Sequence, residues 1–146
     1  MSESRPSMAQ EIAEAVIAFQ RRTTGHAPKA VTVVLSQDTL VVWLHEALSP
    51  AEKDLARDPS GAAQVQEFHR QLFLTSCQSL QEETKRITGV EWRNAVAEVE
   101  PTKGDMVQAF TRSGMVQVFR LARNVPDSSW GGRGPEASGV SKETVT

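Results

Sequence analysis

The residues of this chain that could do chemistry are few, and three histidines come first among them. His26, His45 and His69 could each serve as a general base or bind a metal through a ring nitrogen. Two histidines that bind one metal from a single helix are usually four residues apart, and no pair here has that spacing. We therefore predict no metal site and no catalytic residue. A small-molecule-binding or enzymatic pocket between the long helix and the sheet, with His45 or His69 as its polar anchor, remains an alternative.

The other reactive groups also lack the surroundings that catalysis requires. Cys77, the one cysteine, falls in an apolar stripe, where we expect its thiol to pack as a small hydrophobe with a raised pKa. The chain has no Gly-x-Ser-x-Gly or Ser-x-x-Lys motif for a serine nucleophile. The glycine-rich run at 131–134 lacks the Lys-Ser/Thr pair of a phosphate-binding loop. The sequence therefore indicates no cofactor and a function other than catalysis.

Hydrophobic spacing predicts the elements that must position these residues. Apolar residues recur at helical spacing after a capping box formed by Ser7 and Gln10, which predicts a helix over 7–22. Segments rich in β-branched residues at 29–36 and 39–46 predict an antiparallel hairpin. The hairpin should form the first half of a sheet.

This hairpin has apolar residues on both of its faces. One face would hold Val31, Val33, Leu35, Leu40, Val42 and Leu44. Because the opposite face is apolar as well, we expect a second copy of the chain, another protein or the apolar segment 115–121 to cover it. The predicted interaction-surface residues are Val34, Val41, Trp43, Val116, Val118 and Phe119.

Two helix pieces and a second hairpin follow. Ser49-Pro50-Ala51-Glu52 combines an N-cap, a proline at the first helical position and a closing acid. A long helix should restart at Asp58-Pro59 and end at Gly89. Segments 90–100 and 105–112 predict the second hairpin. The apolar stripe predicted for the long helix comprises Val65, Phe68, Leu72, Phe73, Ser76, Cys77, Leu80, Thr84 and Ile87.

The predicted fold class is therefore α+β. It has an antiparallel four-stranded sheet, with elements in the order α-β-β-α-α-β-β, packed on a long amphipathic helix. We predict a single domain over residues 1–122. The polar tail over 123–146 should be disordered, because it has too few apolar residues to offset the entropy of ordering.

Charge and apolar content narrow the choice of partners. The 146 residues include 16 Lys and Arg and 18 Asp and Glu, so the net charge of −2 offers no general attraction for nucleic acid or anionic lipid. No apolar run approaches the roughly 20 residues of a membrane-spanning helix. We expect a cytoplasmic protein that reaches a membrane only through a partner. A nucleic-acid-binding regulator remains a second alternative, using Arg21, Arg22, Lys29, Lys85, Arg86 and Arg93.

Several loop segments, in order and spacing, resemble the MpsC-like domain family over about residues 8–112. They are Gly25-His26-Ala27-Pro28-Lys29, the run from Leu48 to Ala56, Thr88-Gly89-Val90, Thr102-Lys103-Gly104 and Phe110-Thr111. Ala27 departs from the family pattern, in which a second glycine is common. The residues that carry the resemblance are Gly25, Pro28, Ser49, Pro50, Glu52, Gly89 and Gly104.

The resemblance implies a function that composition and spacing do not. The family, long classed as a domain of unknown function, is associated with a sodium-translocating, membrane-potential-generating system. It implies a soluble accessory or regulatory component near a membrane cation or inorganic-carbon system, with no catalytic residues to transfer. The resemblance adds a membrane transporter subunit as an expected partner, beside the homodimer expected from the apolar hairpin face.

Overall fold

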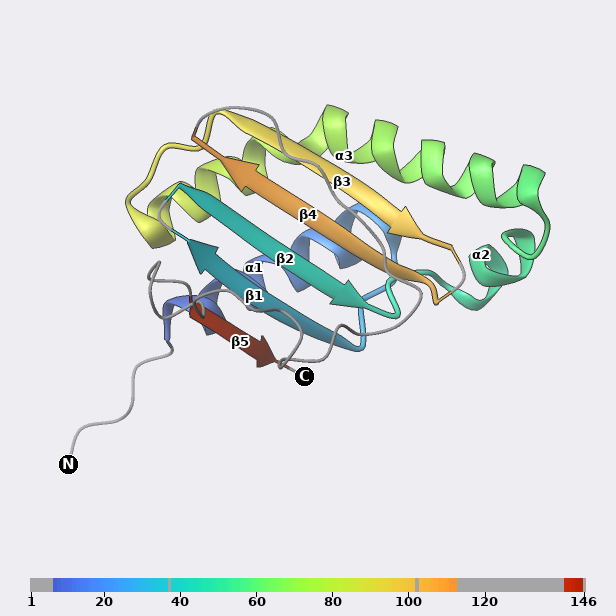
Figure 1. Cartoon of the computed structure of the whole chain (residues 1–146), viewed down its shortest axis with the longest axis horizontal. Coiled ribbons are helices and arrows are strands. Elements are labelled where there is room, and N and C mark those ends of the chain that lie inside the picture. Colours follow the sequence, from blue (N-terminus) through green and yellow to red (C-terminus); the bar gives the residue numbers. More distant parts are fainter. Residues whose placement is uncertain (1–6, 37, 102, 113–140, 146) are drawn as a thin grey trace, which may run out of the picture.

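The computed structural model describes residues 7–36, 38–101 and 103–112, and the backbone of 141–145 (Figure 1). The elements appear in the predicted order, followed by one further strand. They are α1 (Met8–Thr24), β1 (Ala30–Ser36), β2 (Thr39–His45), α2 (Pro50–Leu55), α3 (Pro59–Thr88), β3 (Asn94–Glu100), β4 (Asp105–Thr111) and β5 (Ser141–Val145).

The helix ends follow from their capping residues. The hydroxyl of Ser7 accepts a hydrogen bond from the backbone N–H of Gln10 at 3.0 Å, and α1 ends at Gly25, where φ is 79°. The carboxylate of Asp58 caps α3 by accepting from the N–H of Gly61 at 2.7 Å. Gly89 ends α3 with φ at 75°, a left-handed conformation that favours glycine. The predicted helix starts are confirmed.

The strands form one antiparallel sheet in the order β3-β4-β2-β1-β5. The four predicted strands are confirmed, although β3 begins at Asn94, four residues later than predicted, and Trp92 is buried ahead of it. β5 is an addition, and it lies within the tail that we predicted to be disordered. It pairs with the edge of β1, where unpaired backbone N–H and C=O groups can accept another strand. The predicted domain boundary at 122 and the segment 115–121 lie outside the described residues.

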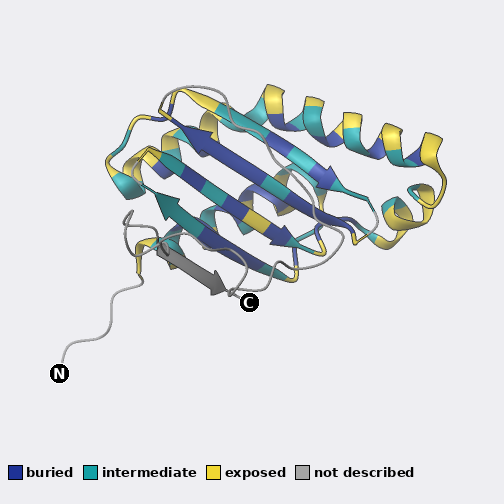
Figure 2. Cartoon of the chain, in the orientation of Figure 1, coloured by how far each residue is buried: buried dark blue, intermediate teal, exposed yellow. Residues whose placement is uncertain are grey.

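Both long helices, α1 and α3, lie on the same face of the sheet (Figure 1). The side chains between helices and sheet form the core, in which the Phe73 ring contacts Phe19 and Phe110 at centroid distances of 6.3 and 6.0 Å. The predicted inward face of the first hairpin is confirmed by its burial (Figure 2). Its residues Val31, Val33, Leu40, Val42 and Leu44 are at most 2% exposed.

The core also contains an amide pair. Gln20 of α1 and Gln108 of β4 are both buried, and Nε2 of Gln108 donates to Oε1 of Gln20 at 3.4 Å. Within the described part of the chain, the remaining polar atoms of the pair, Nε2 of Gln20 and Oε1 of Gln108, have no hydrogen-bond partner. Leaving buried polar atoms without partners costs stability.

One residue of the predicted α3 stripe is wrong. The side chain of Phe68 is 54% exposed, whereas its neighbour His69 is 2% exposed and faces inward. The buried positions Gly61, Val65, His69 and Phe73 are spaced by four residues, so the stripe passes through His69 instead of Phe68.

Candidate interaction surface

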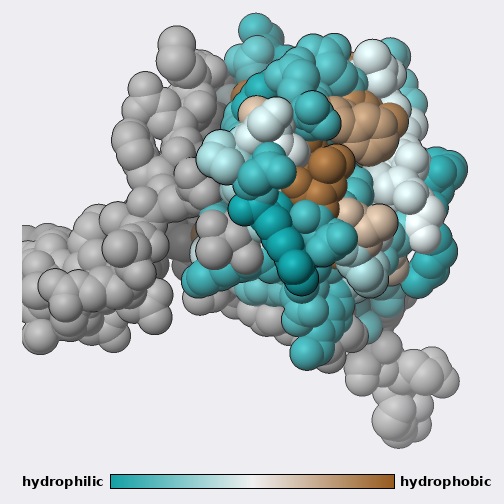
Figure 3. Space-filling model, turned by 90° about the vertical axis from the view of Figure 1, so that its right-hand side faces the viewer, coloured by the Kyte–Doolittle hydropathy of each residue, from teal (hydrophilic) through white to brown (hydrophobic). Residues whose placement is uncertain are grey.

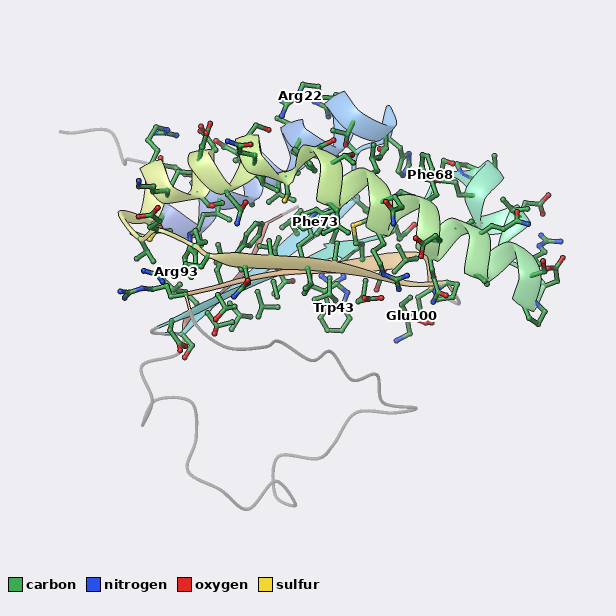
Figure 4. All side chains as sticks on the ribbon, turned by 90° about the horizontal axis from the view of Figure 1, so that it is seen from above. Arg22, Trp43, Phe68, Phe73, Arg93 and Glu100 are labelled. Atoms are coloured by element: carbon green, nitrogen blue, oxygen red, sulfur yellow. The ribbon has the colours of Figure 1, made fainter. Side chains whose placement is uncertain are left out.

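The candidate surface is the face of the sheet opposite α1 and α3, and Trp43 lies near its centre. Figure 4 shows Trp43 on the side of the sheet away from α3, with Phe73 between the helix and the sheet. Trp43 is 43% exposed, whereas Val34 and Val41 of the same face are half-buried. The structure therefore places three of the predicted interaction residues on one face. The other three, Val116, Val118 and Phe119, lie outside the described residues.

The turn between β3 and β4 supports this face. Gly104 has φ at 79°, and its carbonyl oxygen accepts from the N–H groups of Ala47 at 2.7 Å and Leu48 at 3.1 Å. These bonds join the turn to the segment that leads from β2 into α2. The turn therefore fixes where β2 ends relative to β4.

Asp105, directly after that turn, holds the tryptophan. Its side chain is buried, and both carboxylate oxygens accept hydrogen bonds: Oδ1 from the N–H of Glu46 at 2.8 Å and Oδ2 from Nε1 of Trp43 at 3.1 Å. Glu46 adopts φ at 51°, the left-handed region that non-glycine residues rarely occupy. Asp105 thus fixes the backbone at the end of β2 and the edge of the indole together.

His45 holds the ring of the same tryptophan. The two rings stack with centroids 5.6 Å apart and planes 14° apart. Nε2 of His45 lies 2.8 Å from Oγ1 of Thr32 on the neighbouring strand, which fixes the imidazole in turn. Trp43 is therefore both exposed and restrained at its edge and its face.

His69 takes part in a different contact. Its Nε2 lies 2.7 Å from Oε2 of Glu52. Oε1 of the same carboxylate closes the capping box of α2 by accepting from the N–H of Ser49 at 2.9 Å. Burial raises the pKa of the Glu52 carboxyl, but the hydrogen bonds from Ser49 and His69 outweigh burial and place the pKa below its ordinary value. Glu52 therefore links α2 to α3.

The histidines do not meet in one pocket. His45 belongs to the Trp43 face, as predicted, whereas His69 belongs to a helix on the opposite side of the sheet. His26 lies 3.3 Å through Nε2 from the carbonyl oxygen of Glu46. Among the described residues, no three His, Cys, Asp or Glu side chains gather closely enough to hold a metal ion.

Cys77 behaves as predicted from its position in the stripe. Its side chain is half-buried against the core, and burial raises the pKa of its thiol. A raised pKa lowers the thiolate fraction at neutral pH and so lowers reactivity.

The residues that carry the family resemblance perform structural roles. Gly25 and Gly89 end helices, Gly104 forms the β3–β4 turn, and Pro28 is buried just before β1. Ser49, Pro50 and Glu52 start α2, with the capping box complete. Sequence reasoning missed the bond from Glu52 to His69 and the role of Asp105, because both contacts join distant segments. An acid immediately after a turn glycine was the one local signal for Asp105.

The cationic residues of the nucleic-acid alternative are dispersed. Arg21 and Arg22 lie in the last turn of α1, and Lys85 and Arg86 lie in the last turn of α3. These two helix ends point to opposite ends of the molecule (Figure 1). Lys29 pairs with Glu46 at 3.6 Å and Arg86 pairs with Glu83 at 2.6 Å, so two of these cations have acidic neighbours.

A second exposed apolar area lies where α2 meets α3. Leu55 and Phe68 are 49% and 54% exposed. Figure 3, which looks onto this end of the molecule, shows hydrophobic side chains gathered among hydrophilic ones. None of the helices within the described residues has the length and apolarity needed to cross a membrane.

Fold and surface define a class: an α+β domain with its long helices on one sheet face and a restrained, exposed tryptophan on the other. Residues 4–113 match the model of the family described as Na+-translocating membrane potential-generating system (MpsC), and the chain belongs to this family. A search of curated proteins and a search of solved structures found no match. The resemblance seen in the sequence is confirmed.

Proposed function

We propose that this chain is a non-enzymatic accessory domain of a sodium-translocating, membrane-potential-generating system. In this proposal it binds a protein component of that system through the sheet face around Trp43. Membership of the family supports the system, and the restrained, exposed indole supports the binding mode. An aromatic side chain that is ordered before binding loses little conformational entropy when a partner covers it.

The chemistry around Trp43 suits a protein partner. Half-buried Val34 and Val41 extend the apolar area, while Thr32 and Asp105 place polar groups beside it. An apolar centre with a polar border is typical of interfaces that form and separate. The partner we propose is a membrane transporter subunit, which would bring this chain to the cytoplasmic side of the membrane.

The enzymatic alternative has less support. That alternative places a pocket between α3 and the sheet with His45 or His69 as its polar anchor. His45 instead stacks on Trp43 at the sheet face away from α3, and Nε2 of His69 contacts the carboxylate of Glu52. The dispersed cations give the nucleic-acid alternative equally little support. A homodimer that buries Trp43 is the closer rival, because it would cover the same face.

The test is affinity capture from native membranes in mild detergent, comparing wild type with Trp43→Ala and Leu74→Ala. Leu74 is 54% exposed on α3, so its replacement removes a similar exposed apolar group far from the Trp43 face. We expect wild type and Leu74→Ala to recover an integral membrane transporter subunit, and Trp43→Ala to recover at least tenfold less. Equal recovery by all three variants, or dimer formation by wild type that Trp43→Ala abolishes, would contradict the proposal.

A further inference from the structure

The outer edge of β1 pairs with β5, a strand whose residues match those of β1 poorly. β1 pairs with β2 on one side and with β5, five residues long, on the other. On the β2 side, Val31, Val33 and Leu35 lie opposite Leu44, Val42 and Leu40. This pairing matches apolar residues at every helix-facing position.

On the β5 side the same positions are matched differently. Val31 lies opposite Val145, but Val33 lies opposite Glu143 and Leu35 lies opposite Ser141. Two of the three positions on the helix-facing side of β5 are therefore polar. Cross-strand pairs of apolar residues stabilise a sheet, so β5 depends more on its backbone pairing than β2 does.

The connection between β4 and β5 contains more residues than the distance between the two strands requires. Thr111 at the end of β4 and Ser141 at the start of β5 lie at the same end of the sheet, because their rows of paired residues are adjacent. Three strand spacings separate the two strands, about 14 Å. Residues 112–140 span far more than that when extended, at about 3.3 Å per residue. The length of this connection therefore does not require β5 to occupy the edge.

We infer that the outer edge of β1 is a strand-acceptor site, and that β5 occupies it as a weak internal competitor. Its occupant in a complex is an extended segment of a protein partner with apolar residues opposite Val31, Val33 and Leu35. In strand addition, backbone hydrogen bonds supply affinity and the alternating side chains supply specificity. The tether keeps β5 at a high effective concentration, so a partner must offer a better-matched strand to displace it.

This inference does not rest on the proposed function. The edge of β1 and the Trp43 face are different surfaces, so loss of one binding activity need not affect the other. Trp43→Ala should leave strand binding unchanged, which separates the failure of one proposal from the failure of the other.

The probe is a fluorescein-labelled peptide of residues 138–146 carrying Ser141→Val and Glu143→Val, which supplies the missing apolar positions. A matched peptide carries proline at 142 and 143 instead. Successive residues of a strand direct their N–H groups to opposite edges, so one of the two prolines removes an N–H that would bond to β1. Fluorescence anisotropy would measure the binding of both peptides to the full chain and its variants.

Two variants of the full chain control whether β5 is in place. Lys142→Pro/Glu143→Pro releases β5 from the edge. Val34→Cys/Lys142→Cys, in a Cys77→Ala background, joins two paired positions by a disulfide and locks β5 in place. The oxidised and reduced forms of the locked variant are the same polypeptide, so they control for any effect of the substitutions on folding.

We expect the release variant to bind the apolar peptide at least tenfold more tightly than wild type. The oxidised lock should not bind it, and reduction should restore binding to the wild-type level. The proline peptide should bind none of the proteins. Equal affinity of released, wild-type and locked chains, or binding of the proline peptide as tight as that of the apolar peptide, would overturn the inference.

Discussion

Nε1 of Trp43 donates a hydrogen bond to Oδ2 of Asp105 across 62 positions of sequence, at 3.1 Å. This bond joins the most exposed aromatic group of the sheet to the turn that precedes β4. Because Asp105 also accepts from the backbone of Glu46, the carboxylate is shared between the surface and the fold.

Asp105→Ala should therefore destabilise the domain and loosen Trp43. The change leaves the N–H of Glu46 without its acceptor, and an unsatisfied buried donor costs about 1–3 kcal/mol. Urea unfolding followed by far-ultraviolet circular dichroism would measure the loss. Asp54→Ala is the control, since Asp54 is exposed in a surface pair with Arg57 and should change the free energy of unfolding by less than about 0.5 kcal/mol. Equal effects of the two substitutions would refute this role for Asp105.

Gly61→Ala should be destabilising even though it places alanine in a helix. Alanine ordinarily stabilises a helix interior by about 1 kcal/mol relative to glycine. Here its Cβ would lie 1.8 Å from the backbone oxygen of Leu55, so α2 must move away from α3. We expect a net loss of about 1–3 kcal/mol, the usual cost of overpacking. Ser79→Ala, at an exposed position of the same helix, should be neutral or slightly stabilising in the same thermal melts. A stabilised Gly61→Ala would show that α2 does not pack as described.

Glu52→Ala should destabilise the domain in a pH-dependent way. The pKa of Glu52 lies below its ordinary value in the folded chain, so its charged form stabilises the fold above the unfolded-state pKa. That contribution is lost as the pH falls through the folded pKa. The difference in unfolding free energy between wild type and Glu52→Ala should be about 1–3 kcal/mol at pH 7, from the lost hydrogen bond to the N–H of Ser49 and the unpaired His69. It should shrink as the pH falls below about 4. A difference that stays constant from pH 7 to pH 3 would rule out this linkage.

Cys77 should react slowly with thiol reagents. Burial raises the pKa of its thiol, so less thiolate is present at pH 8 than in a free cysteine. We expect modification by a disulfide reagent at least tenfold more slowly than that of glutathione, with the rate rising in denaturant. A native rate equal to that of glutathione would contradict the packing described for this residue.

Local features were predictable from the sequence, and long-range contacts were not. Helices begin at Ser7 and Asp58 and end at Gly25 and Gly89. Each cap bonds to residues only a few positions away, so a short stretch of sequence suffices to locate these helix ends. The inward face of the first hairpin likewise follows from alternation along two adjacent strands.

The misses have physical causes. Phe68 was expected in the core because it is apolar, but the four-residue spacing and the bond to Glu52 turn His69 inward instead. β5 was missed because its sequence, Ser-Lys-Glu-Thr-Val, lacks apolar alternation; its pairing depends on the free edge of a strand over a hundred positions earlier. The partnership of Trp43 with Asp105 required knowing that β4 lies beside β2.

The amides of Gln20 and Gln108 affect how many arrangements the helix layer can adopt. Apolar contacts are not directional, so apolar residues alone would select one placement of α1 on the sheet less strictly than a hydrogen bond does. The hydrogen bond between Gln20 and Gln108 requires the observed alignment of α1 with β4. A shift of α1 by one turn would leave both buried amides without this bond. The two amide atoms without partners lower the stability of the fold, while the bond between the amides favours one placement of α1 on the sheet.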